Sequence, residues 1–412
     1  MAACWIRAGM LPTNYYGYAN GRSTPAFKFS FYLRHGTEPA ITNTTDKGYT
    51  LRSDLSPDMA KNDSTRGSDS EPGPSSATVD FIADSASNPL ALEIDWSTTD
   101  NDSAYGDEVS TYTCSITSSV MDFPEIEGRR YHAYRQGRYA LPNDEEENER
   151  LDIHHALIYT AMGGRLFYAP IGQSPQRVLD IATGTGIWAM DFADEFPSAQ
   201  VLGNDLSPTQ PTLVPPNLEF IVDDVEDEWG YEHQPFDFIH ARFLAGAIRD
   251  WPKLMRQALE CTKPGGWVEF QDWDTFLYSA DNSMPPDSAI NRFHQMSGGA
   301  REAMGYSMCP GRHLQRWMTD AGFINISCTK ILLPLGPWAK NRQAKKIGAY
   351  NLLQMQQGLE GILLGTLPHA KPRPWSNDEI MVFLADIRKD FQNPKIHGQY
   401  DFYVVYGQRP MA

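Results

Sequence analysis

One segment, Val178-Leu-Asp-Ile-Ala-Thr-Gly-Thr-Gly-Ile-Trp188, constrains the fold more than any other part of the chain. A short apolar strand that runs into glycines and then a helical pattern is typical of a doubly wound α/β sheet. Gly184 and Gly186 lack side chains, so the turn can be tight and its backbone can approach a ligand closely. The segment also fits Gly-x-Gly-x-x-Ala, so by itself it does not exclude a dinucleotide-binding enzyme.

Strand and helix patterns alternate from this point onward. We expect strands at 177–181, 199–204, 218–222, 236–241 and 267–271, with helices at 187–196 and 251–262. The alternation predicts a parallel sheet with helices on both faces and right-handed crossovers. Further along we expect helical structure at 286–321, a strand at 323–332, helices at 341–364 and 377–391, and a strand at 400–406.

The composition divides the chain into three parts. Residues 36–119 are rich in Ser, Thr, Asp, Asn, Gly and Pro without an apolar period, so we expect 1–119 to be mostly disordered. Residues 120–176 are expected to form a helical lid segment, with helix between Glu146 and Phe167. Residues 177–412 are expected to form the main domain, with helical insertions at about 281–320 and 341–391.

Charge and cysteine usage narrow the classes of partner. A formal net charge of −17 repels phosphate backbones, so we expect no direct nucleic-acid binding. The five cysteines are scattered and form no Cys-x-x-Cys pair, so neither a disulfide framework nor a metal site is expected. No apolar run approaches the roughly 18 residues that cross a bilayer. We therefore expect no membrane partner and a cytoplasmic or nuclear location.

Carboxylates at the strand ends indicate the ligand. Asp180 ends the first strand, where a carboxylate can accept from the α-amino group of an amino-acid-like ligand and would repel a pyrophosphate. Asp205 ends the second strand, where it can accept from both ribose hydroxyls. Asp224, or as second candidate Asp223, follows the third strand and can bind adenine together with the Val225 amide. This order favours S-adenosylmethionine over a dinucleotide.

Two side chains are candidate general bases. His240 lies at the end of the fourth strand and is the first candidate, and Glu269 on the fifth strand is the second. Both residues also fit a purely structural role as hydrogen-bonded packing residues. His154 and His155 are adjacent on a predicted helix, so their spacing does not form a two-histidine metal site.

With these residues in view, the chain resembles the fungal LaeA-type methyltransferase family from about Thr113 to Pro410. Its marks are Gly128-Arg-Arg-Tyr-His-Ala-Tyr, Leu141-Pro-Asn-Asp-Glu-Glu-Glu, Asp205-Leu-Ser-Pro-Thr-Gln-Pro and Tyr403-Val-Val-Tyr-Gly-Gln-Arg-Pro. The resemblance implies a seven-stranded, Rossmann-like class I sheet and S-adenosylmethionine as cofactor. It implies cofactor contacts by the turn Asp180–Gly186, by Asp205 with Leu206, and by Asp224. Ala182 departs from the family pattern, which has a glycine there.

Three functions stay open at this stage. The first is an S-adenosylmethionine-dependent methyltransferase that methylates a small molecule in fungal secondary metabolism, with acceptor contacts expected in Asp281–Thr319. The second is a LaeA-like regulator that acts through protein partners in the nucleus. The third is an NAD(P)-dependent oxidoreductase, although the chain lacks the Tyr-x-x-x-Lys pair of one dehydrogenase class.

Overall fold

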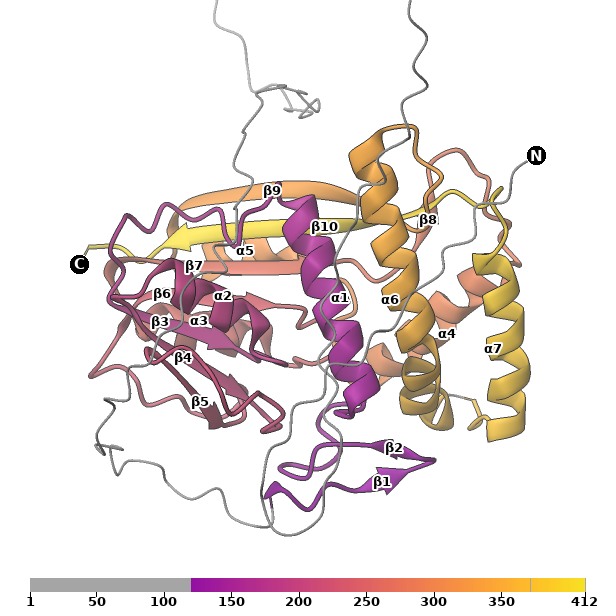
Figure 1. Cartoon of the computed structure of the whole chain (residues 1–412), viewed down its shortest axis with the longest axis horizontal. Coiled ribbons are helices and arrows are strands. Elements are labelled where there is room, and N and C mark those ends of the chain that lie inside the picture. Colours follow the sequence, from indigo (N-terminus) through magenta and orange to yellow (C-terminus); the bar gives the residue numbers. More distant parts are fainter. Residues whose placement is uncertain (1–119, 371, 412) are drawn as a thin grey trace, which may run out of the picture. The chain divides into compact units, whose positions relative to one another are not determined.

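A mixed sheet of eight strands runs through the part of the chain that the structure describes (Figure 1). The computed structural model describes residues 120–370 and 372–411, so the expected disordered region 1–119 lies outside it. The strand order is β5-β4-β3-β6-β7-β10-β8, and β9 pairs with β10. The strands are β3 (Arg177–Ile181), β4 (Gln200–Asp205), β5 (Leu218–Val222), β6 (Phe236–Arg242), β7 (Thr262–Trp273), β8 (Tyr278–Ser279), β9 (Ile324–Pro334) and β10 (Gly398–Gln408).

The parallel half of the sheet agrees with the alternation seen in the sequence. β3 pairs in parallel with β4 on one side and with β6 on the other. β10 instead runs antiparallel to both β7 and β9. The expected seven strands are all present, and the additional β8 is a two-residue strand that pairs with the start of β10. The strand order reverses direction between β3 and β6, and ligands bind at such a switch point in open α/β sheets.

Helices cover both faces of this parallel half. Val178 packs with Trp188 and Phe192 of α2 (Ile187–Glu195). Leu179, the next residue, packs on the opposite face with the cluster that contains α3 (Trp251–Glu260) and α5 (Leu314–Ala321). Successive strand residues point to opposite faces, so the apolar run in β3 is explained by burial on both sides.

A second group of helices lies beside the antiparallel end of the sheet (Figure 1). Its members are α1 (Glu145–Ala161), α4 (Ala289–Ala303), α6 (Arg342–Thr366) and α7 (Asn377–Phe391). The Asp144 side chain caps α1 by accepting from the Glu147 amide at 3.0 Å. Ahead of α1, a short hairpin of β1 (Glu125–Ile126) and β2 (Arg129–Arg130) was not expected from the sequence.

The segment before α1 packs closely against glycines of α6. A methyl group at Gly361 would lie 3.2 Å from Pro142 Cδ, and one at Gly365 would collide with the Ala140 carbonyl. The missing side chains therefore let residues 140–142 rest directly on the helix backbone. This contact holds the segment 132–143, which we call the lid loop, beside the carboxyl ends of the parallel strands.

Candidate functional site

A cavity of about 280 Å³ lies at the carboxyl ends of β3, β4, β5 and β6. On one side it is bounded by the strand wall, which we define as lining residues from 180–188, 205–209, 223–226 and His240. The opposite side is the helix wall, defined as Arg242 at the end of β6 and lining residues from α1, the 243–248 loop, α4 and α6 together with Trp273, Thr275, Met308 and Tyr400. The lid loop supplies the remaining lining residues.

All of the expected cofactor residues except Gly186 line this cavity: Asp180, Ala182, Gly184, Asp205, Leu206, Asp223, Asp224 and Val225. Gly186 has a different role. Its φ is 78°, and a methyl group there would collide with the Phe220 ring, so the glycine is needed for packing of the turn. Gly184, with φ of 60°, faces the cavity, and a methyl group there would meet Leu151 at 3.6 Å.

Asp205 is held by backbone amides. Its Oδ2 accepts from the Gly184 N–H at 2.9 Å and its Oδ1 accepts from the Ser207 N–H at 3.0 Å. Burial raises the pKa of Asp205 to about 6, although these hydrogen bonds oppose the rise. The carboxylate is thus fixed in orientation before any ligand arrives.

Asp180 and His240 form a buried pair between β3 and β6. His240 Nδ1 lies 2.7 Å from Asp180 Oδ1, and the Thr183 hydroxyl donates to Asp180 Oδ2 at 2.5 Å. The His240 ring stacks on Trp188 with centroids 3.6 Å apart. Burial lowers the pKa of His240, so the ring is neutral and donates its Nδ1–H to Asp180. Within the described residues, His240 Nε2 has no hydrogen-bond partner.

Asp224 leaves one buried oxygen without a hydrogen bond. The residue is 4% exposed, and its Oδ1 accepts from the Glu226 N–H at 3.0 Å. Oδ2 finds no hydrogen-bond donor among residues 120–370 and 372–411, and Arg138 Nε approaches it only to 3.6 Å. A buried carboxylate oxygen in this state fits a donor group of a ligand.

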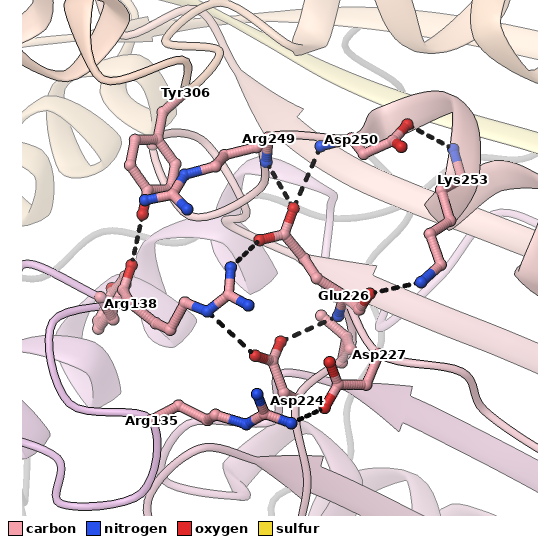
Figure 2. Close-up of polar contacts among 12 residues, drawn as sticks. Arg135, Arg138, Asp224, Glu226, Asp227, Arg249, Asp250, Lys253 and Tyr306 are labelled. Atoms are coloured by element: carbon pink, nitrogen blue, oxygen red, sulfur yellow. Dashed lines mark hydrogen bonds and ion pairs between the residues drawn. The ribbon is translucent and has the colours of Figure 1, made fainter.

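Figure 2 shows the polar contacts that join the lid loop to the residues that follow β5. Arg138 pairs with Glu226 at 3.6 Å as well as with Asp224, and Arg135 pairs with Asp227. The Tyr306 hydroxyl, from the segment after α4, donates to the Arg138 carbonyl at 2.8 Å. Strand ends, lid loop and α4 region are therefore joined through one polar network.

Glu269, the second candidate base, lies outside the cavity lining. Its Oε2 accepts from the Tyr168 and Ala169 amides at 2.8 and 2.7 Å, and its Oε1 accepts from Gln271 at 2.7 Å. Burial raises its pKa to about 7. The side chain anchors the segment after α1 to β7, so the expectation that it faces an acceptor is corrected.

The helix wall contains chemistry that the sequence did not reveal. His154 is 2% exposed, stacks on Phe243 at 3.6 Å, and has no partner for either ring nitrogen among the described residues. Arg242 follows His240 by two residues on β6 and so points to the same face. From the sequence, this two-residue spacing could have predicted that Arg242 lies on the same face of the strand as His240. No local pattern could have placed α1 beside β6.

Neither a metal site nor a membrane-spanning helix is found in the described part of the chain. No group of three or more His, Cys, Asp or Glu side chains in 120–370 and 372–411 is arranged to hold a metal ion. In the same ranges, no helix combines the length and the apolar character needed to span a membrane.

Comparison with known proteins identifies the family. A methyltransferase domain model matches residues 153–327. The methyltransferase pytC of Aspergillus terreus is 37% identical over 324 residues, which is 78% of this chain and 97% of that protein. The secondary metabolism regulator LAE1 of Cochliobolus heterostrophus is 34% identical over 289 residues, which is 69% of this chain and 94% of that protein. The probable methyltransferase tdiE of Emericella nidulans is 31% identical, covering 72% and 92%.

The Gly184-x-Gly186 motif occurs in both methyltransferases and dehydrogenases, so it could not decide between them. The relatives are methyltransferases, and they therefore exclude the oxidoreductase interpretation. The strand order and the carboxylates at the strand ends are consistent with the methyltransferase fold of these relatives. The chain belongs to the fungal LaeA-type family of S-adenosylmethionine-dependent methyltransferases of secondary metabolism.

Proposed function

We propose that the cavity binds S-adenosylmethionine along the strand wall and presents a small-molecule acceptor from the helix wall. When bound, the cofactor supplies an electrophilic methyl group on a sulfonium. The observation that carries the proposal is one cavity in which all lining carboxylates, Asp180, Asp205, Asp223, Asp224 and Glu226, belong to the strand wall. The protein then contributes positioning and exclusion of water.

The residues present fit the cofactor group by group. The ribose hydroxyls would donate to Asp205, whose oxygens are already oriented by the amides of Gly184 and Ser207. The adenine amine would donate to Asp224 Oδ2, which lacks a protein donor, and the Val225 amide would face the ring beside it. Asp223 accepts from the Asp224 amide at 2.9 Å and would support this geometry.

The methionyl part of the cofactor would lie along the glycine turn. Asp180 would accept from its amino group, and Leu206 would contact the nucleoside from the other side. Ala182 adopts a φ of 51° in place of the family glycine, so its methyl group does not prevent the turn from forming. Gly184 would provide the close backbone approach, and Gly186 would keep the turn packed.

His240 remains the proposed general base for a hydroxyl acceptor. Its Nδ1–H is held by Asp180, which leaves the Nε2 lone pair to receive a proton. Its lowered pKa keeps the ring neutral near pH 7, so it can accept that proton. We propose no catalytic role for Glu269, because three donors occupy its oxygens.

The lid segment 120–176 is proposed to close the cofactor end of the cavity. Arg138 and Arg135 bring the lid loop onto Asp224–Asp227, and α1 supplies Arg150, Leu151 and His154 to the lining. The expected acceptor region 281–319 supplies Phe293, His294, Ser297 and Arg301 through α4. A concave cavity with aromatic lining supports a small-molecule acceptor. A regulatory role through protein partners is the second candidate, since a relative carries the name of a secondary metabolism regulator.

The first test is calorimetric titration with S-adenosylhomocysteine and with NADH, on wild type and Asp205→Ala. We expect micromolar binding of the sulfur ligand, weakened about 100-fold in the variant because two charge-assisted hydrogen bonds are lost. Glu219→Ala on β5, outside the cavity, is the control and should bind like wild type. Binding of NADH alone, or of neither ligand, would contradict the proposal.

A further inference from the structure

Four arginines line the cavity, and they differ in how their charge is balanced. Arg138 pairs with Asp224 and Glu226, and Arg150 makes two hydrogen bonds to Glu147 at 2.9 and 2.7 Å. Arg301 donates to the Gly246 carbonyl and stacks on Tyr306. Arg242 makes no ion pair with a carboxylate anywhere in 120–370 or 372–411; its one side-chain hydrogen bond goes to His155.

The hydrogen bond to His155 determines the orientation of the Arg242 guanidinium. Arginine can only donate, so His155 Nδ1 accepts from Arg242 Nη2 at 2.9 Å. The proton of the ring is therefore on Nε2, which donates to Asp191 Oδ2 at 3.0 Å. Burial lowers the pKa of His155, in agreement with a neutral ring. The chain Asp191–His155–Arg242 orients the guanidinium while leaving its other N–H groups free.

Leaving this cation without an anion is costly unless a ligand supplies one. Burial lowers the pKa of Arg242 to about 10, although Asp180 and Asp191 raise it in part from beyond ion-pair distance. The group stays charged near pH 7, and its neighbour His154 is neutral because burial lowers that pKa as well. A planar guanidinium with two free donors matches a carboxylate in bidentate geometry.

We propose that Arg242 is a carboxylate-binding residue of this cavity, with His155 as its positioning residue; the inference rests on the proposed function. Two molecules can bring the carboxylate. One is the cofactor, whose methionyl tail would lie near Asp180, on the strand that pairs with β6. The other is an anionic acceptor that lies against the aromatic side chains of the helix wall, Phe243, Trp273 and Phe293.

The first arm of the test compares two ligands that differ by the amino-acid tail. The full chain is titrated with S-adenosylhomocysteine and with 5′-methylthioadenosine, as wild type, Arg242→Gln and Arg242→Lys. If the cofactor supplies the carboxylate, Arg242→Gln weakens the first ligand about tenfold or more and leaves the second within about twofold. Arg242→Lys recovers part of the loss. Arg292→Gln, an exposed arginine of α4 outside the cavity, changes neither.

The second arm tests the acceptor as the source. Protein saturated with S-adenosylhomocysteine is titrated with 2-naphthoate and with the neutral 2-naphthamide. If the acceptor supplies the carboxylate, wild type prefers the anion about tenfold, and Arg242→Gln removes the preference without changing affinity for S-adenosylhomocysteine. An Arg242→Gln variant that alters neither ligand overturns the inference. Wild type that binds neither nucleoside overturns the proposed function itself.

The role of His155 has its own readout. His155→Leu should reproduce the carboxylate-specific loss of Arg242→Gln, while 5′-methylthioadenosine binds as before. His155→Gln places an amide oxygen where Nδ1 accepted, so it should restore most of the affinity. Equal loss for both nucleosides, or no rescue by Gln, would show that His155 supports the fold and does not position Arg242.

Discussion

The two walls of the cavity satisfy their polar groups in different ways. In the strand wall, Asp205 and Asp224 accept hydrogen bonds from backbone amides of the turns that follow β3, β4 and β5. In the helix wall, both ring nitrogens of His154 and the Ser297 hydroxyl are buried without a partner in the described part of the chain. The strand-wall carboxylates are therefore oriented by backbone amides even though Asp224 Oδ2 and His240 Nε2 have no partner, whereas the buried groups of His154 and Ser297 in the helix wall receive no hydrogen bond from the described residues.

This difference is what a constant cofactor and a variable acceptor require. Groups fixed by the backbone hold one ligand in one geometry with little reorganisation. Side chains projecting from α1, α4 and α6 can change without disturbing the sheet. The predictions below test whether the strand wall is as rigid, and as separate from the helix wall, as this comparison implies.

The largest effect is expected in the glycine turn. Gly186→Ala should destabilise the protein by about 2–4 kcal/mol, because a positive φ and a collision with Phe220 act together. Gly184→Ala should cost only about 1 kcal/mol but abolish binding of S-adenosylhomocysteine, since its methyl group enters the cavity. Urea unfolding and calorimetry separate the two effects. A Gly186→Ala variant that is as stable as wild type and still binds the ligand would contradict the claim that the backbone of the glycine turn fixes the strand wall.

Acidification should weaken cofactor binding through Asp205. Its pKa of about 6 in the folded protein lies above the ordinary aspartate value of 3.8, so folding favours the protonated form. The contribution of this group to stability is therefore largest at low pH and declines as pH rises from about 4 to 6. Binding has the opposite sign: affinity for S-adenosylhomocysteine should fall about tenfold from pH 7.5 to pH 5 as the carboxylate protonates.

The control for this pH profile is Asp205→Asn, which cannot ionise. Its affinity should be weaker at every pH and should not show the fall around pH 6. A profile equally steep in the variant would assign the titration to another group, and the rigid wall would lose its main electrostatic support.

The lid loop should have a smaller influence on the strand wall. Arg138→Gln removes ion pairs to Asp224 and Glu226, but the arginine side chain is 34% exposed and water screens the pairs. We expect about a threefold loss of affinity for S-adenosylhomocysteine, seen mainly as faster dissociation in stopped-flow measurements. Arg316→Gln, whose partner Asp320 is also exposed, should change nothing. A loss of affinity above about 30-fold would show that the lid loop holds the cofactor as strongly as the strand wall does.

The smallest effect is expected at Ala182. Ala182→Gly would relieve a left-handed φ of 51° but would also add freedom to the unfolded chain, and these effects oppose each other. We expect a change in unfolding free energy within about 1 kcal/mol and unchanged cofactor affinity. A clear gain in affinity would show that the methyl group crowds the cavity.

Much of the strand wall could be predicted from the sequence, because its residues directly follow strands that are recognisable from local apolar patterns. The turn Asp180–Gly186 and the carboxylates at Asp205 and Asp224 follow strands whose apolar runs are legible, so parallel packing brings them together. The helix wall was not accessible in the same way. Placing His154 against Phe243 depends on how α1 packs across the sheet edge, and the partners of Glu269 come from a loop with no pattern of its own.

The glycines of α6 have a consequence for how this molecule opens. Each glycine within a helix costs about 1 kcal/mol relative to alanine, so α6 depends on its neighbours for order. Gly361 and Gly365 lie under residues 140–142, so the helix loses its covering when that loop lifts. The lid loop and this part of α6 should exchange their amide hydrogens as one cooperative unit, distinct from the sheet. Ligand entry would thus begin as local unfolding shared by two segments far apart in the chain.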